Sequence, residues 1–403
     1  MNRIKEALRW RIVFERPIYL NKMIQLKDSD AIKILTGVRG SGKSSLMKLY
    51  KIHLINEGIP DRNIVYMDFE SYDYQSINNQ ERLRTALNKL NLQIQDGIYW
   101  LFDEIQLVTG WQQVVNDLKA ISDCDVMIAG SNSDILSEEL HGGCSEITVH
   151  PLSFKEFLQV KQMSSDSRPI DEVYDEFEKY GGMPAVLLTH EESKNTALQG
   201  IFVSSILRDV VYKSFIKDSA SLKGVISFLL TNIGSFLNAS KISNTLNDRG
   251  VVTSVPTVRR YLNLLETSYL FDKVKKYDIE NHEYLKTNSK YFMVDSGLNR
   301  STIGLSADNI SSMESIVYME LKRRGYHVDV GYLDNREIGF VATRLDETVY
   351  VRSVFDLSEA IDATEGFNKI NDNRKKMLVS SYYQETKQEN DIEVKYIVDW
   401  LLE

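Results

Sequence analysis

A glycine-rich segment, Gly37 to Ser45, stands between an apolar run and a helical pattern. It matches Gly-x-x-x-x-Gly-Lys-Ser in full, in the strand-to-helix context that this phosphate-binding loop requires. Glycines allow backbone N–H groups to curl around a β-phosphate, and the positive end of the following helix dipole points at the same group. We expect Lys43 to reach the β- and γ-phosphates and the Ser44 hydroxyl to face Mg²⁺. The predicted cofactor-binding residues are Gly37, Arg39, Gly40, Ser41, Gly42, Lys43, Ser44 and Ser45.

Two carboxylates follow a second apolar run, Tyr99 to Phe102. We expect a buried strand with Asp103 and Glu104 at its tip, where Asp103 would hold Mg²⁺ through water and Glu104 would orient and polarise the attacking water. The predicted metal ligands are therefore Ser44 and Asp103. An ordinary strand that ends in solvated acids is the alternative, and the phosphate-binding loop upstream favours the catalytic interpretation.

A polar turn, Gly130 to Ser133, follows the next apolar run. A polar side chain here would lie between the two acids and the γ-phosphate and could report whether that phosphate is present. Asn132 and Ser131 are both candidates, and a plain turn is the alternative. With Asn132 in this role, the predicted catalytic residues are Glu104, Lys43 and Asn132.

Short apolar runs alternate with helical patterns around these residues. The predicted strands are 32–35, 63–69, 97–102 and 126–129, and the predicted helices are 44–55, 81–92 and 111–122. Strands alternating with helices indicate an α/β fold with a doubly wound parallel sheet. The ligand of such a sheet lies beyond the carboxyl ends of its strands. Residues 1–30 are predicted to form a short helix and an arm.

The composition limits the class of protein. A chain of 403 residues is too long for one ordinary domain, so two or three are expected. The formal net charge of −9 argues against binding nucleic acid over the whole surface, although one basic face is compatible with it. Cys124 and Cys144 are too few for a disulfide framework and lack metal-ligand spacing. The N-terminus does not predict a signal peptide, and no apolar run approaches the roughly 18 residues of a membrane span. We therefore expect a cytoplasmic protein with no membrane partner.

Further short motifs give the chain a resemblance to a known family. They are Tyr19-Leu20, Phe102 to Gln106, Gly110-Trp111, Gly130 to Ser133, Pro151 to Phe154, Glu156-Phe157, Tyr180 to Pro184, Arg208 to Val210, Glu337-Ile338 and Phe340-Val341. Together with the phosphate-binding loop, and in this order, they resemble the prokaryotic AAA-type ATPases whose C-terminal half is a domain of unknown function. The resemblance covers nearly the whole chain.

This resemblance implies ATP and ADP as the nucleotides bound, with Mg²⁺ as cofactor. It implies an AAA-like P-loop NTPase domain in residues 1–158, a helical lid or linker in 159–221, and a winged-helix domain in 222–295. The last part, 296–403, would be an α/β domain similar to PD-(D/E)xK nucleases. AAA-type proteins often form rings, so a homo-oligomer is a further expectation.

The chain departs from the family pattern in two places. Cys144 takes the position of an arginine that usually follows a glycine, and we expect slow hydrolysis if that arginine binds phosphate or joins subunits. The positions where a nuclease needs two acids and a lysine hold Gly339, Tyr350 and Arg352. Glu314 and Glu320 remain, but two acids on a helix are interpreted as a solvated face. We therefore predict that the C-terminal domain is not an active nuclease.

Residues 238–276 predict a helix-turn-helix followed by a wing. Ser254 would cap the second helix, with proline in its first turn, and the apolar spacing after it is that of a buried helix face. Arg259 and Arg260 would project away from that face. The wing residues predicted to contact DNA phosphates are Lys273, Lys275 and Lys276. Residues 238–290 hold nine Lys/Arg against six Asp/Glu, a small surplus, so an interdomain lid or a protein-docking module is the alternative.

Three functions stay open on these patterns. The first is an ATPase that couples its nucleotide state to domain rearrangement. The second is a regulatory nucleotide switch with little turnover, and the third is a DNA-associated factor that acts through the winged helix. Arg208-Asp209, on a predicted helix, would be an arginine finger for a neighbouring subunit or, more simply, part of a salt bridge.

Overall fold

The computed structural model describes residues 14–90, 97–121, 124–136, 138–141, 143–163, 166–187, 189–212, 216, 218–303, 309–383, 387–389 and 391–403. The chain divides into two compact units, Met1–Val149 and His150–Glu403. The finer domain boundaries expected from the sequence, after residues 158, 221 and 295, remain predictions.

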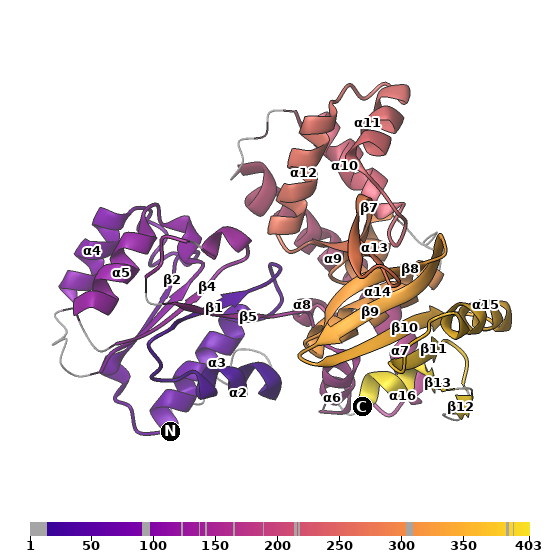
Figure 1. Cartoon of the computed structure of the whole chain (residues 1–403). Coiled ribbons are helices and arrows are strands. Elements are labelled where there is room, and N and C mark those ends of the chain that lie inside the picture. The colour runs from indigo at the N-terminus through magenta and orange to yellow at the C-terminus, as the bar shows by residue number, and fades with distance from the viewer. Residues whose placement is uncertain are drawn as a thin grey trace. The chain divides into compact units, whose positions relative to one another are not determined.

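The first unit is built on a five-stranded parallel sheet with the strand order β2-β3-β4-β1-β5 (Figure 1). The strands are β1 (Ile32–Thr36), β2 (Ile64–Asp68), β3 (Tyr99–Asp103), β4 (Asp125–Ala129) and β5 (Cys144–Thr148). The predicted α/β class and the four predicted strands are confirmed, with shifts of one or two residues at the strand ends. The sequence did not predict β5, because Ile147 is its one fully buried residue and the strand forms no apolar run.

Helices cover both faces of this sheet (Figure 1): α2 (Pro17–Gln25) and α3 (Lys43–Asn56) on one, α4 (Gln80–Lys89) and α5 (Trp111–Ile121) on the other. One apolar cluster joins Phe102 to Leu83 of α4 and Val115 of α5. The other joins Leu101 to Met47 of α3. Successive side chains of a strand point to opposite faces of the sheet, and here both faces are covered by helices. All five positions of β1, β3 and β4 are therefore buried.

The second unit begins with a series of helices. They are α6 (Phe154–Met163), α7 (Ile170–Tyr180), α8 (Pro184–Leu187), α9 (Glu191–Ser205), a π-helix (Ile206–Tyr212), α10 (Ser219–Leu230), α11 (Ala239–Asp248) and α12 (Val255–Thr267). The predicted cap of α12 is present, since Ser254 accepts a hydrogen bond from the Thr257 amide and Pro256 lies in the first turn. A single bridging residue, Leu237, precedes α11 and pairs with Ser289.

An eight-stranded sheet follows, in the order β12-β13-β11-β10-β9-β8-β6-β7 (Figure 1). Its strands are β6 (Phe271–Asp278), β7 (Glu283–Met293), β8 (His327–Leu333), β9 (Arg336–Arg344), β10 (Glu347–Val354), β11 (Lys375–Ser380), β12 (Lys387–Glu389) and β13 (Ile392–Tyr396). Four helices complete the unit: α13 (Ser296–Ile303), α14 (Asn309–Arg323), α15 (Leu357–Asn368) and α16 (Ile397–Leu402). β6 and β7 pair in antiparallel fashion, and β6, which carries the lysines of the predicted wing, also pairs in parallel with β8 from Lys276 to Asp278. β6 and β7 therefore belong to the same sheet as the C-terminal strands.

A buried carboxylate accounts for the glycine pair in the Tyr180-to-Pro184 motif. The Gly182 amide donates to Asp295 Oδ2 at 2.7 Å, and a Cβ on Gly181 would lie 2.0 Å from Asp295 Oδ1. A Cβ on Gly182 would lie 2.2 Å from the Leu152 carbonyl oxygen. Glycine fits both positions because the Asp295 carboxylate and the Leu152 backbone leave no room for a Cβ.

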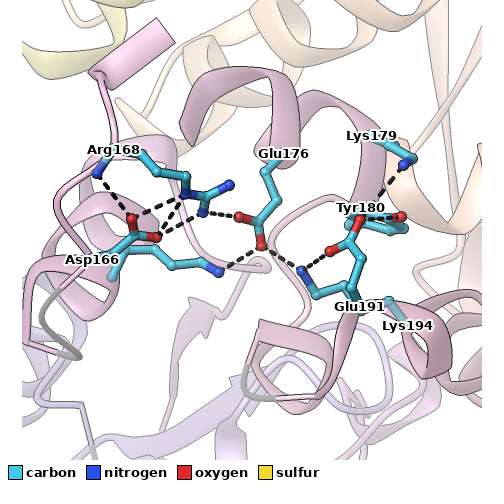
Figure 2. Close-up of polar contacts among 8 residues, drawn as sticks. Asp166, Arg168, Glu176, Lys179, Tyr180, Glu191 and Lys194 are labelled. Carbon is cyan, nitrogen blue, oxygen red and sulfur yellow. Dashed lines mark hydrogen bonds and ion pairs between the residues drawn. The ribbon is translucent and has the colours of Figure 1, made fainter. Parts of the chain in front are cut away.

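A polar network around Glu176 ties α6, α7 and α9 together (Figure 2). Lys161 Nζ lies 2.6 Å from Glu176 Oε1, and Lys194 and Arg168 also bond this carboxylate. Burial raises the pKa of Glu176, but the hydrogen bonds from Arg168, Lys161 and Lys194 outweigh it and lower the pKa to about 2. Glu176 is therefore ionised and held by cations from both neighbouring helices.

Candidate functional site

The glycine-rich loop joins β1 to α3 in a conformation that its glycines allow. Gly37, Gly40 and Gly42 have φ angles of 128°, 84° and 105°, in the region that favours glycine. A Cβ on Gly37 would lie 2.3 Å from the carbonyl oxygen of Val149, so this position needs glycine for packing as well. Gly42 is the N-cap of α3, so the free N–H groups of the first helical turn point into the loop.

Lys43, the first residue of α3, is 3% exposed. Its Nζ donates to the carbonyl oxygens of Gly37 at 2.7 Å and Val38 at 3.1 Å, which places the ammonium within the loop. Phosphate oxygens bind an ammonium more strongly than neutral carbonyls do, so Lys43 is placed to exchange these partners for phosphate. Ser41 is buried, Ser44 is half-buried and Ser45 is exposed.

Asp103 ends β3 as a fully buried carboxylate. Its Oδ2 accepts a hydrogen bond from the Tyr66 hydroxyl at 2.8 Å. Burial and then the Glu104 carboxylate raise the pKa of Asp103 to about 6, against the lowering effect of the Ser44 and Tyr66 hydroxyls. Oδ1 is buried with no hydrogen-bond donor in good geometry. A carboxylate oxygen without a partner, beside a serine hydroxyl, fits the oxygen ligands that Mg²⁺ requires.

Glu104 has a left-handed backbone with φ 54° and ψ 41°, which is uncommon for a residue other than glycine. The residue is 6% exposed. Its Oε2 accepts hydrogen bonds from Ser131 Oγ at 3.1 Å and from Gln106 Nε2, and Arg39 Nη2 lies 3.9 Å away. Glu104 is thus neither solvated nor at the end of an ordinary strand, and its carboxylate has a fixed direction.

The turn after β4 lies between the loop and the acids, because β4 is placed between β1 and β3 in the sheet. Of the two residues left open there, Ser131 is the one that bonds Glu104. Asn132 is 2% exposed, and its side chain accepts from the Asp134 amide at 3.0 Å as the cap of a short 3₁₀ helix. A role for Asn132 at the γ-phosphate remains a prediction.

Three residues of this site carried no sequence signal. Arg16 is 4% exposed, donates from Nη1 to the Ser41 carbonyl at 2.9 Å and lies over the Tyr19 ring. Glu70 pairs with Arg39 at 2.8 Å, and Tyr66 bonds Asp103. Each of these residues bonds a site residue that is 25 to 37 positions away along the chain. No local sequence pattern indicates contacts over such separations.

Cys144 does not lie at the phosphate-binding loop. It pairs with Ile32 at the amino end of β1, whereas the loop follows Thr36 at the carboxyl end. Four residues of strand separate the two ends by about 13 Å. This register argues against the first of the two roles considered for an arginine here, binding of phosphate within the same chain. A role for this position at a subunit contact stays untested.

The two acids on α14 are not a solvated face, which corrects the sequence interpretation. Lys290 Nζ lies 2.9 Å from Glu314 Oε1 and 2.5 Å from Glu337 Oε1. Glu320 is 6% exposed and pairs with Arg323 and Arg324. Both acids are part of ion pairs within the fold. The partner of Glu314 comes from β7 and gives no signal in the helix pattern, whereas the partners of Glu320 lie three and four residues after it along the chain.

The positions that replace the nuclease residues are also built into the fold. Gly339 has φ 125°, and a Cβ there would lie 2.6 Å from the Val351 carbonyl oxygen, so a side chain would need the backbone to move. Arg352 bonds the Glu337 carbonyl and Asp362 Oδ2, and Tyr350 donates to Asp372 at 2.6 Å. The absence of nuclease activity remains a prediction.

The three predicted wing lysines differ in their surroundings. Lys276 Nζ lies 3.1 Å from the centre of the Tyr332 ring, and Lys275 Nζ lies 5.0 Å from that of Tyr284. Lys273 is exposed on β6. Packing of Lys276 on an aromatic ring argues against the phosphate contact expected for it. Arg208 is exposed on the π-helix and Asp209 beside it is buried.

Comparison with known proteins places these features in a family. Residues 29–158 match the family model described as an AAA domain, and residues 171–309 match a domain of unknown function (DUF8612). A protein of Haemophilus influenzae, itself described as uncharacterized, is 46% identical over 398 residues, which are 98% of this chain and 100% of that protein. The uncharacterized protein MJ1544 of Methanocaldococcus jannaschii is 27% identical over 370 residues, 85% of this chain and 81% of that protein.

Among solved structures, the Walker-type ATPase PABY2304 of Pyrococcus abyssi is similar with a TM-score of 0.52. It is 15% identical, and the match covers 72% of this chain and 96% of that chain, which shows a shared fold. In the described part of this chain, no helix combines the length and the apolar composition needed to cross a membrane. The chain therefore belongs to the family of AAA-type P-loop ATPases, with an AAA domain followed by a domain of unknown function.

Proposed function

We propose that this chain binds ATP with Mg²⁺ and hydrolyses it, and that its domains rearrange with the nucleotide state. One observation carries the proposal: Lys43, Asp103 and Glu104 come together at the carboxyl edge of one parallel sheet, with Ser131 bonded to Glu104 from the strand between them. This is the edge at which open α/β sheets bind ligands. Membership of the AAA-type family and the shared fold with a Walker-type ATPase support ATP as the nucleotide.

Each residue has a separate task in this proposal. Lys43 would leave the loop carbonyls and neutralise the β- and γ-phosphate oxygens, while the loop N–H groups hold the β-phosphate. Ser44 and Asp103 would hold Mg²⁺, which supplies charge neutralisation on the phosphates. Glu104 would accept a hydrogen bond from the attacking water and align it with the γ-phosphorus.

A nucleotide switch with little turnover is the alternative in which the same residues bind but Glu104 stays inactive. The contacts that Ser131 and Gln106 make to Glu104 Oε2 favour it, because two donors already occupy the oxygen that would accept a hydrogen bond from the attacking water. Phosphate binding within one chain at the position of Cys144 gives it no support, since that residue lies at the opposite end of the strands from the loop.

Turnover measurements separate the two. We would measure phosphate release with ATP and Mg²⁺ for the wild type, Glu104→Gln and Lys43→Ala, with the exposed Glu81→Gln on α4 as the matched control. An ATPase should lose about 10²–10³-fold in rate with Glu104→Gln while ATP still binds, and Lys43→Ala should lose binding. If the wild type binds ATP but releases no more phosphate than Glu104→Gln, the switch is the correct description. If ATP affinity is the same in Lys43→Ala as in the wild type, the nucleotide site itself is wrong.

DNA association through α11 and α12 is a second candidate. Lys241, Arg259 and Arg260 are exposed on these two helices, and Lys273 is exposed on the following strand. Binding of a mixed-sequence duplex at low salt should weaken steeply as salt rises, and Arg259→Glu should weaken it further. A duplex that fails to bind even at low salt removes this candidate and leaves the ATPase proposal intact.

A further inference from the structure

Arg39, the third residue of the phosphate-binding loop, is placed between two acids. Its Nη1 lies 2.8 Å from Glu70 Oε1, and its Nη2 lies 3.9 Å from Glu104 Oε2. The Arg39 side chain is 14% exposed, against 30% for Glu70 and 8% for Glu104. The ion pair with Glu70 gives the guanidinium its direction, and Nη2 then lies near the Glu104 carboxylate that follows β3.

Glu70 is brought to the loop by the turn that follows β2. The Asp68 side chain accepts a hydrogen bond from the Glu70 amide at 3.0 Å, and the Asp68 carbonyl accepts from the Ser71 amide at 3.0 Å. Asp68 pairs with Asp103 across β2 and β3, so this turn and the acids occupy the same edge of the sheet. Arg39 thus joins three separate chain segments: the loop after β1, the turn after β2 and the end of β3.

The place of the guanidinium relative to the nucleotide follows from Glu104. A residue that aligns water for attack must lie beside the γ-phosphate, and the Arg39 guanidinium lies within 4 Å of that residue's carboxylate. Guanidinium binds phosphate through parallel N–H···O bonds, more strongly than it binds one carboxylate oxygen. A γ-phosphate at this position would therefore compete with Glu70 for the N–H groups of the Arg39 guanidinium.

We infer that Arg39 reads the terminal phosphate of ATP in competition with Glu70. This inference rests on the proposed nucleotide site. Without a γ-phosphate, Arg39 stays on Glu70; with ATP bound, Arg39 turns from Glu70 to the γ-phosphate and its charge lies beside Glu104 during attack. ADP lacks the terminal phosphate and leaves the Arg39–Glu70 pair in place. The chain would then distinguish ATP from ADP with an arginine of its own.

Paired affinities for two nucleotides test this competition. We would measure the Kd of ADP and of a non-hydrolysable ATP analogue, each with Mg²⁺, for the wild type, Arg39→Gln, Glu70→Gln and the double variant. Glu57→Gln is the matched control, because Glu57 is also a surface acid in an ion pair within this unit, with Lys27 at 2.5 Å near the end of α3.

Arg39→Gln should weaken binding of the ATP analogue about tenfold more than binding of ADP, since the charge-assisted pair between Arg39 and the γ-phosphate is lost. Glu70→Gln should tighten binding of the ATP analogue roughly threefold to tenfold, because the competitor for the guanidinium is removed. The Kd of ADP should stay within about twofold of the wild-type value. In the double variant that gain should disappear. Glu57→Gln should change neither nucleotide.

Equal effects on both nucleotides would show that Arg39–Glu70 is a structural ion pair and would overturn the inference. So would weaker binding of the ATP analogue in Glu70→Gln, since Glu70 would then hold Arg39 in place and not compete with phosphate. Either result leaves the proposed function intact as long as the wild type binds both nucleotides and Lys43→Ala does not. A wild type that binds neither nucleotide removes the proposed function and this inference together.

Discussion

Removing the charge of Glu176 should destabilise the second unit in a pH-dependent way. Glu176 is 8% exposed and receives Lys161 and Lys194, whose side chains are 15% and 5% exposed. Lowering its pKa from 4.5 to about 2 corresponds to roughly 3 kcal/mol of favourable interaction. Arg168 is 41% exposed, and solvent screens its share. We therefore expect Glu176→Gln to lower the free energy of unfolding by about 2 kcal/mol at pH 7.

The sign of the pH dependence follows from the lowered pKa. The ionised carboxylate is the stabilised form, so its contribution is complete above the ordinary value of 4.5 and is lost as the pH falls toward 2. The wild type should lose stability over this range, and Glu176→Gln should lose less. Their unfolding curves should thus converge as the solution becomes acidic.

Urea unfolding, followed by circular dichroism at several pH values, measures this effect. Glu191→Gln is the matched control, because Glu191 also pairs with Lys194, at 2.8 Å, but is 60% exposed. Glu191→Gln should lower the free energy of unfolding by less than about 1 kcal/mol. The variant Glu176→Gln/Lys194→Met should regain part of the loss, since it removes a buried ammonium that would keep only the exposed Glu191 as its ionised partner. Equal costs for Glu176→Gln and Glu191→Gln would refute the reasoning.

Three further predictions concern the nucleotide site. Burial raises the pKa of Asp103 from 3.8 to about 6, so the folded state binds more protons than the unfolded state between these values and stability falls as the pH rises through them. In thermal melts of the nucleotide-free protein, Asp103→Asn should remove this decrease in stability with rising pH, and an unchanged pH dependence contradicts the prediction. Asp103→Asn should also abolish Mg²⁺-dependent nucleotide binding. Gly37→Ala, whose Cβ meets the Val149 carbonyl, should weaken ATP binding at least about 100-fold in fluorescence titrations, and an unchanged Kd would show that the loop adjusts. Arg16→Ala should weaken ATP binding about tenfold, because the Ser41 carbonyl loses its hydrogen bond. Arg16→Lys should have an intermediate affinity, and equal affinities in the wild type and both variants contradict a supporting role for Arg16.

The two carboxylates at the end of β3 illustrate what a local pattern can predict. The run from Tyr99 to Phe102 predicts a buried strand because apolar residues on both faces of a parallel sheet must be covered. The strand ends at Asp103, one residue later than predicted, and Glu104 follows it. The direction of Glu104 was not predictable. It depends on a positive φ and on Ser131, which is 27 residues away along the chain.

Corrections from the structure have a common origin. The sequence interpretation took Glu314 as part of a solvated face, and phosphate binding was one of two roles considered for the arginine that Cys144 replaces. Both points depend on which elements lie beside each other in the fold. Lys290 reaches Glu314 only because β7 lies beside α14 in the folded unit. The place of Cys144 is fixed by the register of β5 on β1. Strand register over such separations has no local sequence signal.

The sequence by itself determined the glycine-rich loop, its lysine, the two acids and the alternation of strands and helices. Each of these depends on residue spacing within one turn or one strand, so local sterics and side-chain periodicity decide it. Only the tertiary structure decided that Arg16, Tyr66 and Glu70 join the site. Their partners are brought together by the order β2-β3-β4-β1-β5 and by burial of two apolar cores, a property of the whole unit.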